Sequence, residues 1–368
     1  MPADLNLPLD AAVPATGNSQ IVRCGALERM PKWLICVPLA FQWLWLSLRY
    51  FGTTLPSCAN PNITSGGLVG EGKLEYFSCM GPLARAATAP YIGVVANAEI
   101  SAARLAHAMA SAGLWFPIIA KPDLGLCGFG VRRIDTMAAL LDYFAAYPAD
   151  ETVVLQHYLS QDGEAGIFYA RDPVSEEAKI IGLALRYFPR VIGDGRHTVQ
   201  ELINADPRAG RLLVSKKHDT SIPDGHIPAA GEIVRLATIG STRVGGLYRN
   251  GSKFITAQLT EALDALARDM PSFYCGRFDV RFDSLNELAQ GRGFTIIEVN
   301  GAGSEAIHAW DPDVGLLEGF GMIFTKQRML FSIGAVLRCR GARAVSLFSL
   351  ACLYRRQQRL IEFYPPSN

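Results

Sequence analysis

The sequence predicts a mixed fold of helices and strands, and three stretches of its 368 residues carry that prediction. Two short runs, residues 276–282 and 294–301, alternate apolar and polar side chains as β-strands do. A third run, residues 118–122, has the composition of a strand and is followed by a glycine-rich loop. Residues 259–270 place leucines and a methionine on one helical stripe, which indicates a buried helix face.

Capping signals locate further helices. Asn97 stands where an N-cap is expected, before an alanine-rich helix that ends at Gly113. A second helix is predicted over residues 136–146, after the glycine-rich loop. Thr198 and Glu201 have the spacing of a capping box and predict that a third helix begins there.

The two C-terminal strand runs place polar side chains on one surface. Because alternate residues of a strand share a face, Arg277 lies beside Asp279, and Glu298 lies beside Asn300. The turn-rich residues 284–293 lie between, so the strands are expected to pair as a hairpin. Such oxygen ligands suit Mg²⁺, and the arginine suits a phosphoryl group. An exposed hairpin face with ordinary surface charges explains the same alternation, so both interpretations stay open.

Lys121 belongs to the strand at residues 118–122 and precedes three glycines, Gly125, Gly128 and Gly130. A loop of this kind exposes backbone N–H groups that cradle phosphate, and the lysine adds a point charge. The order differs from that of a Walker A loop, in which the lysine follows the glycines.

Taken in this order, the lysine strand, the glycine loop and the two polar strands resemble the ATP-grasp superfamily. The resemblance covers residues 116–312 and is closest to the D-alanine–D-alanine ligase-like branch. Residues 191–202 are similar to a stretch in the ATP-grasp parts of cyanophycin synthetase and bifunctional glutathione synthetase. The resemblance implies an α+β fold in which two α+β subdomains enclose ATP.

The resemblance also implies roles for single residues. Arg277 matches a catalytic arginine, and the ligands of two Mg²⁺ ions, with Mn²⁺ as an alternative, match Asp279, Glu298 and Asn300. The residues that match ATP contacts are Lys121, Gly125, Gly128, Gly130, Gln156, Tyr158 and Glu164. Within this set Gln156 lies in the hinge strand beside adenine, where many relatives have an acidic residue, and Glu164 matches the residue on the ribose.

The implied activity is ligation of a carboxylate to an amine, or to a thiol, through an acyl phosphate. Two alternatives are a membrane-associated ATP-binding or regulatory module without ligation, and a phosphotransferase. A further phosphate contact falls on either Lys216 or Lys217. The segment after Asn300 departs from the order of small residues in the D-alanine ligases, so the acceptor is expected to differ. The residues placed to read that acceptor are Ser304, Glu305 and His308.

The composition excludes one class of partner and indicates a compartment. A net charge of +1 gives no global field for nucleic acid. Eight cysteines are scattered without a CxxC pair, which favours a reducing, cytoplasmic environment. The oligomeric state does not follow from the sequence. The predicted organisation is an irregular or disordered leader, an apolar Trp-rich segment, a reduced N-terminal region, the ATP-grasp domain and a basic amphipathic helical region, at residues 1–30, 31–52, 53–115, 116–312 and 313–368.

Both terminal regions carry unusual apolar and basic patterns. Residues 33–48 contain no charge and three tryptophans, which suits a membrane interface, but a membrane span needs about 20 apolar residues. Eight basic residues and no acidic ones lie between Lys326 and Arg359. Three interpretations are open: contact with the inner face of a membrane, a true span, or packing of the two ends on each other. Residues 59–73 form either a substrate loop around Lys73 or an irregular linker.

Overall fold

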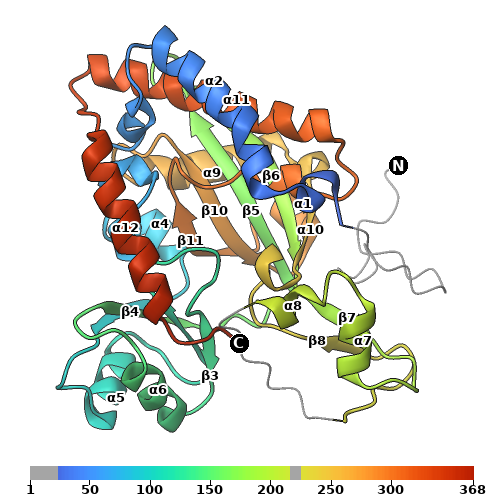
Figure 1. The fold of residues 1–368 in the computed structure, drawn as a ribbon. Coiled ribbons are helices and arrows are strands. Elements are labelled where there is room, and N and C mark those ends of the chain that lie inside the picture. Colours follow the sequence, from blue (N-terminus) through green and yellow to red (C-terminus); the bar gives the residue numbers. More distant parts are fainter. Residues whose placement is uncertain (1–23, 216–224) are drawn as a thin grey trace.

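The protein is described here by a computed structural model that covers residues 24–215 and 225–368. Its described strands form three antiparallel sheets, in the orders β1-β4-β2-β3, β11-β10-β5-β6-β9 and β7-β8. Helices surround these sheets, and the predicted α+β class is therefore confirmed (Figure 1). Lys216 and Lys217 lie outside the described residues, as do residues 1–23 of the predicted leader.

The five-stranded sheet forms the centre of the molecule. Its strands are β5 (Gly163–Arg171), β6 (Ala178–Tyr187), β9 (Leu247–Asn250), β10 (Cys275–Phe282) and β11 (Phe294–Asn300). The pairing of β10 with β11 confirms the predicted hairpin, although the connection contains a short helix, α10 (Leu285–Ala289).

Helices cover both faces of this sheet. On one face Leu263 of α9 (Ala257–Arg268) belongs to the same apolar cluster as Ile167 of β5. On the other face Phe331 of α11 (Leu316–Cys339) belongs to a second cluster with Phe168. Because successive strand residues point to opposite faces, the neighbours Ile167 and Phe168 serve the two cores separately. The predicted buried stripe at 259–270 is confirmed, with Leu259, Leu263, Leu266 and Met270 all buried.

A four-stranded sheet forms a second lobe, at the lower left of Figure 1. It contains β1 (Tyr91–Val95), β2 (Ile118–Pro122), β3 (Arg132–Ile134) and β4 (Thr152–His157), and its helices are α5 (Ala102–Ser111) and α6 (Met137–Ala145). The N-cap of α5 is Ser101, whose side chain accepts from the Arg104 N–H. The prediction of Asn97 was wrong, because Asn97 instead accepts from the Glu99 N–H in the preceding turn.

A smaller lobe joins β7 (Arg190–Ile192) to β8 (Ile233–Arg235), with α7 (Val199–Ala205) and α8 (Arg211–Val214) beside them. The predicted capping box is confirmed, since the Thr198 side chain accepts from the Glu201 N–H and the Glu201 side chain accepts from the Thr198 N–H. The remaining short elements are α1 (Ala26–Arg29), η2 (Leu55–Cys58), η3 (Thr64–Gly67), α3 (Lys73–Ser78), α4 (Pro82–Ala86), η4 (Thr242–Val244), η5 (Ser252–Phe254) and η6 (Ile307–Trp310).

The apolar N-terminal segment forms the helix α2 (Lys32–Arg49), which lies on α11 (Figure 1). The Trp43 ring meets Phe331 edge to face, with 4.9 Å between ring centroids. Pro38 lies inside the helix without ending it. It removes one backbone hydrogen bond, to the carbonyl of Leu34, and Leu34 is 40% exposed so that water can solvate that group. Among the described helices, none is long and apolar enough to span a membrane.

The last helix, α12 (Leu347–Phe363), runs from the end that holds α2 and α11 to the four-stranded sheet (Figure 1). Arg356 forms an ion pair with Glu151 at 3.1 Å, next to the start of β4. Gln357 Nε2 donates to the Gly125 carbonyl at 3.1 Å, and the Tyr364 hydroxyl donates to the Leu124 carbonyl at 2.6 Å. Thus α12 and the residue after it hold the glycine loop from one side.

A buried ion pair attaches α1 to the smaller lobe. The Glu28 side chain is 2% exposed, and its carboxylate lies 2.6 Å from Arg208 Nη2 and 3.1 Å from Arg211 Nη1. The same carboxylate accepts from the Gly25 N–H at 2.8 Å. Removing it would take this carboxylate away from Arg208, which is 6% exposed.

We therefore expect Glu28→Ala to lower the free energy of unfolding by about 3–5 kcal/mol, the usual cost of breaking a buried pair from one side. Glu177→Ala is the matched control, because the Glu177–Lys179 pair at 3.2 Å is largely exposed and such pairs contribute about 0–1 kcal/mol. Urea denaturation of both variants measures the difference. Equal losses would contradict the structural role of Glu28.

Candidate active site

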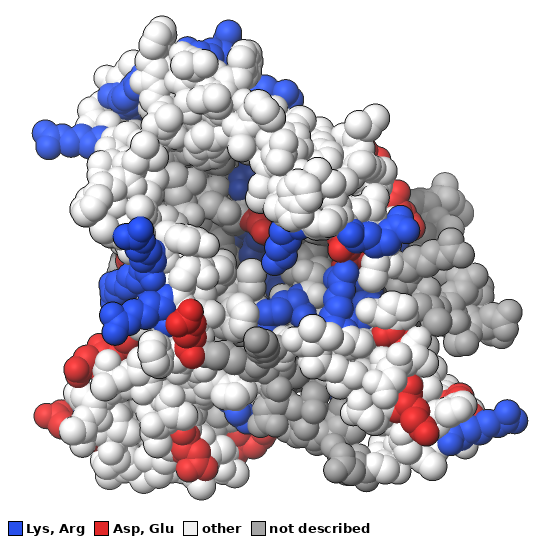
Figure 2. Space-filling view, in the orientation of Figure 1, with Lys and Arg blue, Asp and Glu red and all other residues white. Residues whose placement is uncertain are grey.

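A cavity of about 330 Å³ lies where the sheets and the loop at residues 66–73 meet. Figure 2 shows a hollow between the upper and lower parts of the molecule, with Lys, Arg and acidic side chains inside it. Sequence-predicted residues that line the cavity are Lys121, Gly125, Gly128, Gln156, Tyr158, Glu164, Arg277, Asp279, Glu298, Asn300, Ser304 and Glu305. They come from both large sheets and the loops beside them, so the fold brings together residues up to 184 positions apart in the sequence.

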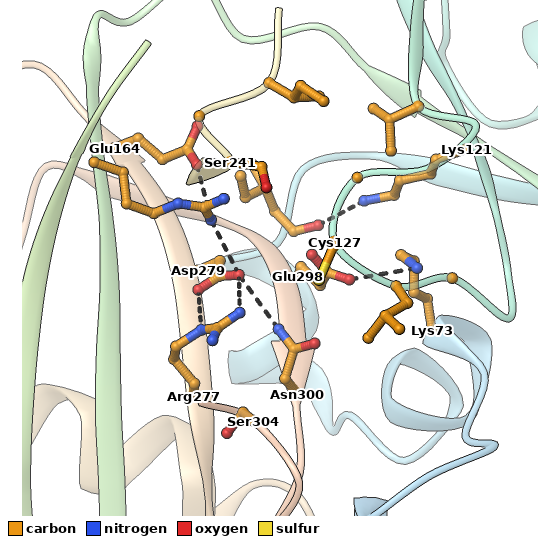
Figure 3. A pocket seen from close by; sticks show the side chains of 18 of the residues that line it. Lys73, Lys121, Cys127, Glu164, Ser241, Arg277, Asp279, Glu298, Asn300 and Ser304 are labelled. Carbon is orange, nitrogen blue, oxygen red and sulfur yellow. Dashed lines mark hydrogen bonds and ion pairs between the residues drawn. The ribbon is translucent and has the colours of Figure 1, made fainter. Parts of the chain in front are cut away.

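The polar strands β10 and β11 form one wall. Their register places Arg277 opposite Asn300 and Asp279 opposite Glu298. Arg277 donates to both oxygens of Asp279, at 2.6 and 2.9 Å, and Asn300 Nδ2 donates to Asp279 Oδ2 at 3.3 Å (Figure 3). The Asp279 side chain is 1% exposed, so these bonds compensate the burial of its charge.

Arg186 was not identified from the sequence, yet it connects the carboxylates. This β6 residue lies 2.9 Å from Glu164 and 3.3 Å from Asp279. Burial acts to lower the pKa of its guanidinium, but the surrounding acidic groups, Glu164 foremost, together outweigh burial and raise it. Arg281 lies 3.3 Å from the other oxygen of Glu164. Glu164, expected on the ribose, is therefore engaged by two arginines.

Two lysines approach the same wall from the opposite side. Lys73 Nζ lies 3.3 Å from Glu298 Oε1 (Figure 3). Lys121 Nζ donates to Gln156 Oε1 at 2.7 Å and to the Ile297 carbonyl at 2.9 Å. Burial acts to raise the pKa of Glu298, but the two ammonium groups hold it far below its usual value, at about 2. Burial lowers the pKa of Lys121 to about 8, a shift that the negative charge of Glu298 limits.

The glycine loop closes the site only in part. Gly125 and Gly128 line the cavity, and a Cβ at Gly125 would lie 2.7 Å from Lys73 Nζ, so a side chain there would displace this ammonium group. Gly128 and Gly130 have positive φ angles of 74° and 72°, which favours glycine. Gly130 lies against Pro122 and Tyr364 rather than at the cavity. It shapes the loop and is not placed to contact a ligand there.

The hinge residues differ from expectation in detail. The Gln156 amide is used within the protein: its oxygen accepts from Lys121, and its Nε2 donates to the Ala89 carbonyl at 3.4 Å. Gln156 lines the cavity, but its side chain already has these two partners within the protein. His308 is buried away from the cavity lining, against Gly182, and burial lowers its pKa to about 4. It is a packed histidine, whereas Ser304 and Glu305 do line the cavity.

The segment at residues 59–73 contributes side chains that the sequence left undecided. Lys73 has been described, and Glu71 also lines the cavity. Within the described structure Glu71 Oε2 is buried and has no hydrogen-bond partner. Burial raises the pKa of Glu71 to about 7, so this carboxyl group exchanges a proton near neutral pH. No strand or helix pattern marks the segment, which is why the sequence could not assign it.

A divalent cation fits the oxygens of this wall. Glu298 is 29% exposed toward the cavity, and the Asn300 amide that donates to Asp279 through Nδ2 keeps its Oδ1 available. Both suit Mg²⁺, which takes one or two carboxylates and completes its shell with water or phosphate. Both oxygens of Asp279 accept hydrogen bonds from arginines, so Asp279 could bind the same ion only if one of these bonds were broken. The described residues contain no cluster of three or more His, Cys, Asp or Glu that could hold a metal by themselves.

Comparison with solved structures finds proteins with a similar fold. The chain resembles a bifunctional glutathione synthetase from Pasteurella multocida (17% identity, 69% of this chain and 35% of that one, TM-score 0.36). It also resembles a D-alanine–D-alanine ligase from Bacillus anthracis, with 13% identity over 73% of this chain and 68% of that one and a TM-score of 0.39. A D-cycloserine synthetase has 12% identity over 74% of this chain and 70% of that one, with a TM-score of 0.38. These are ATP-grasp enzymes. The resemblance stated from the sequence is confirmed to that extent.

The chain spans about a third of the length of the glutathione synthetase. No protein-family model and no curated protein sequence matches it. At these identities and TM-scores the activity has to be argued from the site itself.

The buried lysine provides a pH-dependent test. Because the pKa of Lys121 is about 8 in the folded chain and 10.5 ordinarily, the unfolded chain binds more protons between these values. The free energy of unfolding of the wild type should therefore rise with pH, relative to Lys121→Met, by roughly 3 kcal/mol from pH 8 to 10.5. Thermal unfolding of both proteins across this range measures the change. Parallel curves would show that Lys121 is not buried as a destabilised cation.

Proposed function

We propose that this chain is an ATP- and Mg²⁺-dependent ligase that joins a carboxylate to an amine, or to a thiol, through an acyl phosphate. The observation that carries the proposal is the convergence of two lysines, Arg277, Glu298 and Asn300 in one cavity. Ammonium groups bind phosphate as point charges, and the oxygens bind the cation that accompanies a nucleoside triphosphate. This combination accounts for the buried charges of the site better than a purely structural network does.

The chain's own residues have separable roles in this reaction. Lys73 and Lys121 bind phosphate oxygens, and their burial strengthens the attraction because water screens it less. The loop at residues 125–130 covers the phosphates and excludes water, which would hydrolyse an acyl phosphate. Mg²⁺ held at Glu298 and Asn300 supplies neutralisation of phosphate charge when bound.

Arg277 is assigned to the reacting centre. Its two bonds to Asp279 fix the plane of the guanidinium, and Nη1 donates to the Glu305 carbonyl at 3.3 Å. A cation held in this way stabilises negative charge as it develops, without reorganising during the reaction. Ser304 and Glu305 line the cavity beside it, which leaves space for a second substrate next to the phosphate site.

The second substrate separates the alternatives. A ligase forms ADP only when both a carboxylate and an amine or thiol are present, or forms it much faster then. A phosphotransferase needs no amine, and a non-ligating module binds ATP without turnover. The decisive measurement is Mg²⁺-dependent ADP formation with pooled carboxylates and amines, together with the mass of the product. A condensed product supports the proposal, whereas a phosphorylated product that persists in the presence of amines contradicts it.

Replacement of the metal-strand carboxylate tests the assignment directly. We expect Glu298→Gln to lower kcat for ADP formation by roughly 10²–10³-fold, because the neutral amide keeps the shape of the side chain but is a weaker ligand for the Mg²⁺ that would neutralise the phosphate. Glu287→Gln is the control, since Glu287 is a partly exposed carboxylate paired with Arg292 at 2.9 Å. Unchanged unfolding curves would show that both variants fold. Near-normal turnover by Glu298→Gln would overturn the metal assignment.

The outer face of α2 carries exposed apolar side chains that suit contact with a membrane surface. Trp33, Phe41 and Leu48 are 69%, 70% and 69% exposed, and they lie on one side of a helix with no acidic residue. Lys32 and Arg49 stand at its two ends. An apolar face with interfacial tryptophans and flanking cations complements an anionic bilayer surface. We propose that α2 lies flat on such a surface.

Vesicle sedimentation tests this placement. The wild type should bind vesicles that contain phosphatidylglycerol, less strongly at high salt, and binding should fall at least about tenfold in the double variant Trp33→Ser/Phe41→Ser. Trp115→Ser is the control, because Trp115 is 63% exposed in the four-stranded lobe. A wild type that stays in the supernatant, or equal binding by all variants, would contradict the proposal.

A further inference from the structure

A second cavity, of about 320 Å³, lies beneath α2, next to the candidate active site. Its size falls at the lower end of the range of small-molecule pockets, about 300–1,000 Å³. The helices α2 and α11 form two of its sides, and the chain after β11 forms a third. The apolar residues that define these sides are Leu39, Trp43, Ile323, Leu330, Ala306 and Trp310.

This cavity adjoins the candidate active site. Leu68, Gly303 and Glu305 line both cavities. At the boundary the two loops are joined by backbone, with the Gly303 N–H donating to the Gly67 carbonyl at 2.6 Å. Gly303 packs closely on this backbone, because a Cβ there would lie 2.3 Å from the Leu68 carbonyl oxygen. A ligand in the second cavity therefore lies directly beside the residues of the candidate active site.

Two buried polar groups in the second cavity lack the partners that buried groups usually have. Lys326 is 8% exposed and donates to the Ser304 carbonyl, and within the described structure it forms no ion pair with a carboxylate. Gln327 is 9% exposed; its Nε2 donates to the Leu39 carbonyl at 3.5 Å, while its buried Oε1 accepts from no described residue. Buried polar atoms are normally satisfied by protein, water or a ligand. An ammonium group beside Ser304 also attracts an anion toward the boundary between the cavities.

We propose that the second cavity binds the apolar body of the carboxylate substrate, a medium-chain acyl or arylalkyl acid, whose carboxylate reaches Arg277 in the candidate active site. This assignment rests on the proposed ligase function. A small amino acid such as alanine would leave an apolar cavity unfilled, whereas apolar ligands occupy such cavities readily. The Lys326 ammonium group, beside the Ser304 carbonyl, attracts the carboxylate electrostatically toward the candidate active site.

The test measures binding without ATP, using straight-chain alkanoates of about 4 to about 12 carbons below their micelle concentrations and titration calorimetry. Affinity should rise roughly fourfold for each added methylene, the factor expected for burying one such group, and should level off once the cavity is full. An affinity that does not depend on chain length would overturn the proposal.

A variant at the cavity distinguishes it from the exposed face of α2. Cys36 is exposed and lines the cavity, so Cys36→Trp should reduce its volume without disturbing the core. The longest alkanoates should then bind at least about tenfold more weakly, while Mg-ATP binding stays unchanged. Cys339→Trp is the matched control, because Cys339 is an exposed cysteine at the end of α11 outside the cavity. Unaltered alkanoate binding in Cys36→Trp would place the acids elsewhere and overturn the proposal.

Failure of this inference differs from failure of the proposed function. Length-dependent binding that Cys36→Trp abolishes, without ADP formation from any acid and amine, supports the apolar site and contradicts the ligase. ADP formation with short acids alone, together with an alkanoate series that shows no length dependence, supports the ligase and contradicts the apolar site.

Discussion

The site depends on one buried anion, Asp279, and on the cations that neutralise it. Arg277 and Arg186 both donate to this carboxylate, and Arg186 extends the network to Glu164. Each of these groups would be costly to bury alone, because unpaired charges lose their hydration. Three strands of the central sheet are thus held in register by charge as well as by their backbone bonds, and the Arg277 guanidinium is positioned by the same interaction.

The opposite side of the cavity is arranged differently, with cations that are incompletely compensated. Lys121 bonds to an amide and a carbonyl oxygen, and Lys73 reaches a single carboxylate, Glu298. A surplus of buried positive charge favours an anionic ligand, because the ligand supplies the interactions that water no longer provides. One wall of the cavity therefore consists of charges that neutralise each other, around Asp279. The other wall carries the ammonium groups of Lys73 and Lys121, which suit an anionic ligand.

Sequence reasoning succeeded where a periodic pattern carries the information. The alternation in residues 276–282 and 294–301 predicted the hairpin and brought Arg277 near Asp279, since a strand repeats every two residues. It failed for Arg186 and Glu71, whose roles depend on neighbours distant in the chain. Gln156 was assigned to adenine, but its amide is used by Lys121, a pairing that no local pattern encodes. Lys326 was counted with the basic surface and is buried, because α2 covers that part of α11.

The contacts between α12 and the glycine loop link two distant parts of the molecule mechanically. Gln357 and Tyr364 bind the carbonyls of Gly125 and Leu124, so the loop cannot lift unless these bonds break or the helix moves with it. Each bond contributes about 1 kcal/mol, which makes the first route modestly unfavourable. Since α12 begins near the apolar end formed by α2 and α11, it connects that end to the glycine loop (Figure 1). Under the proposed function, access of nucleotide would then depend on what that end of the protein touches.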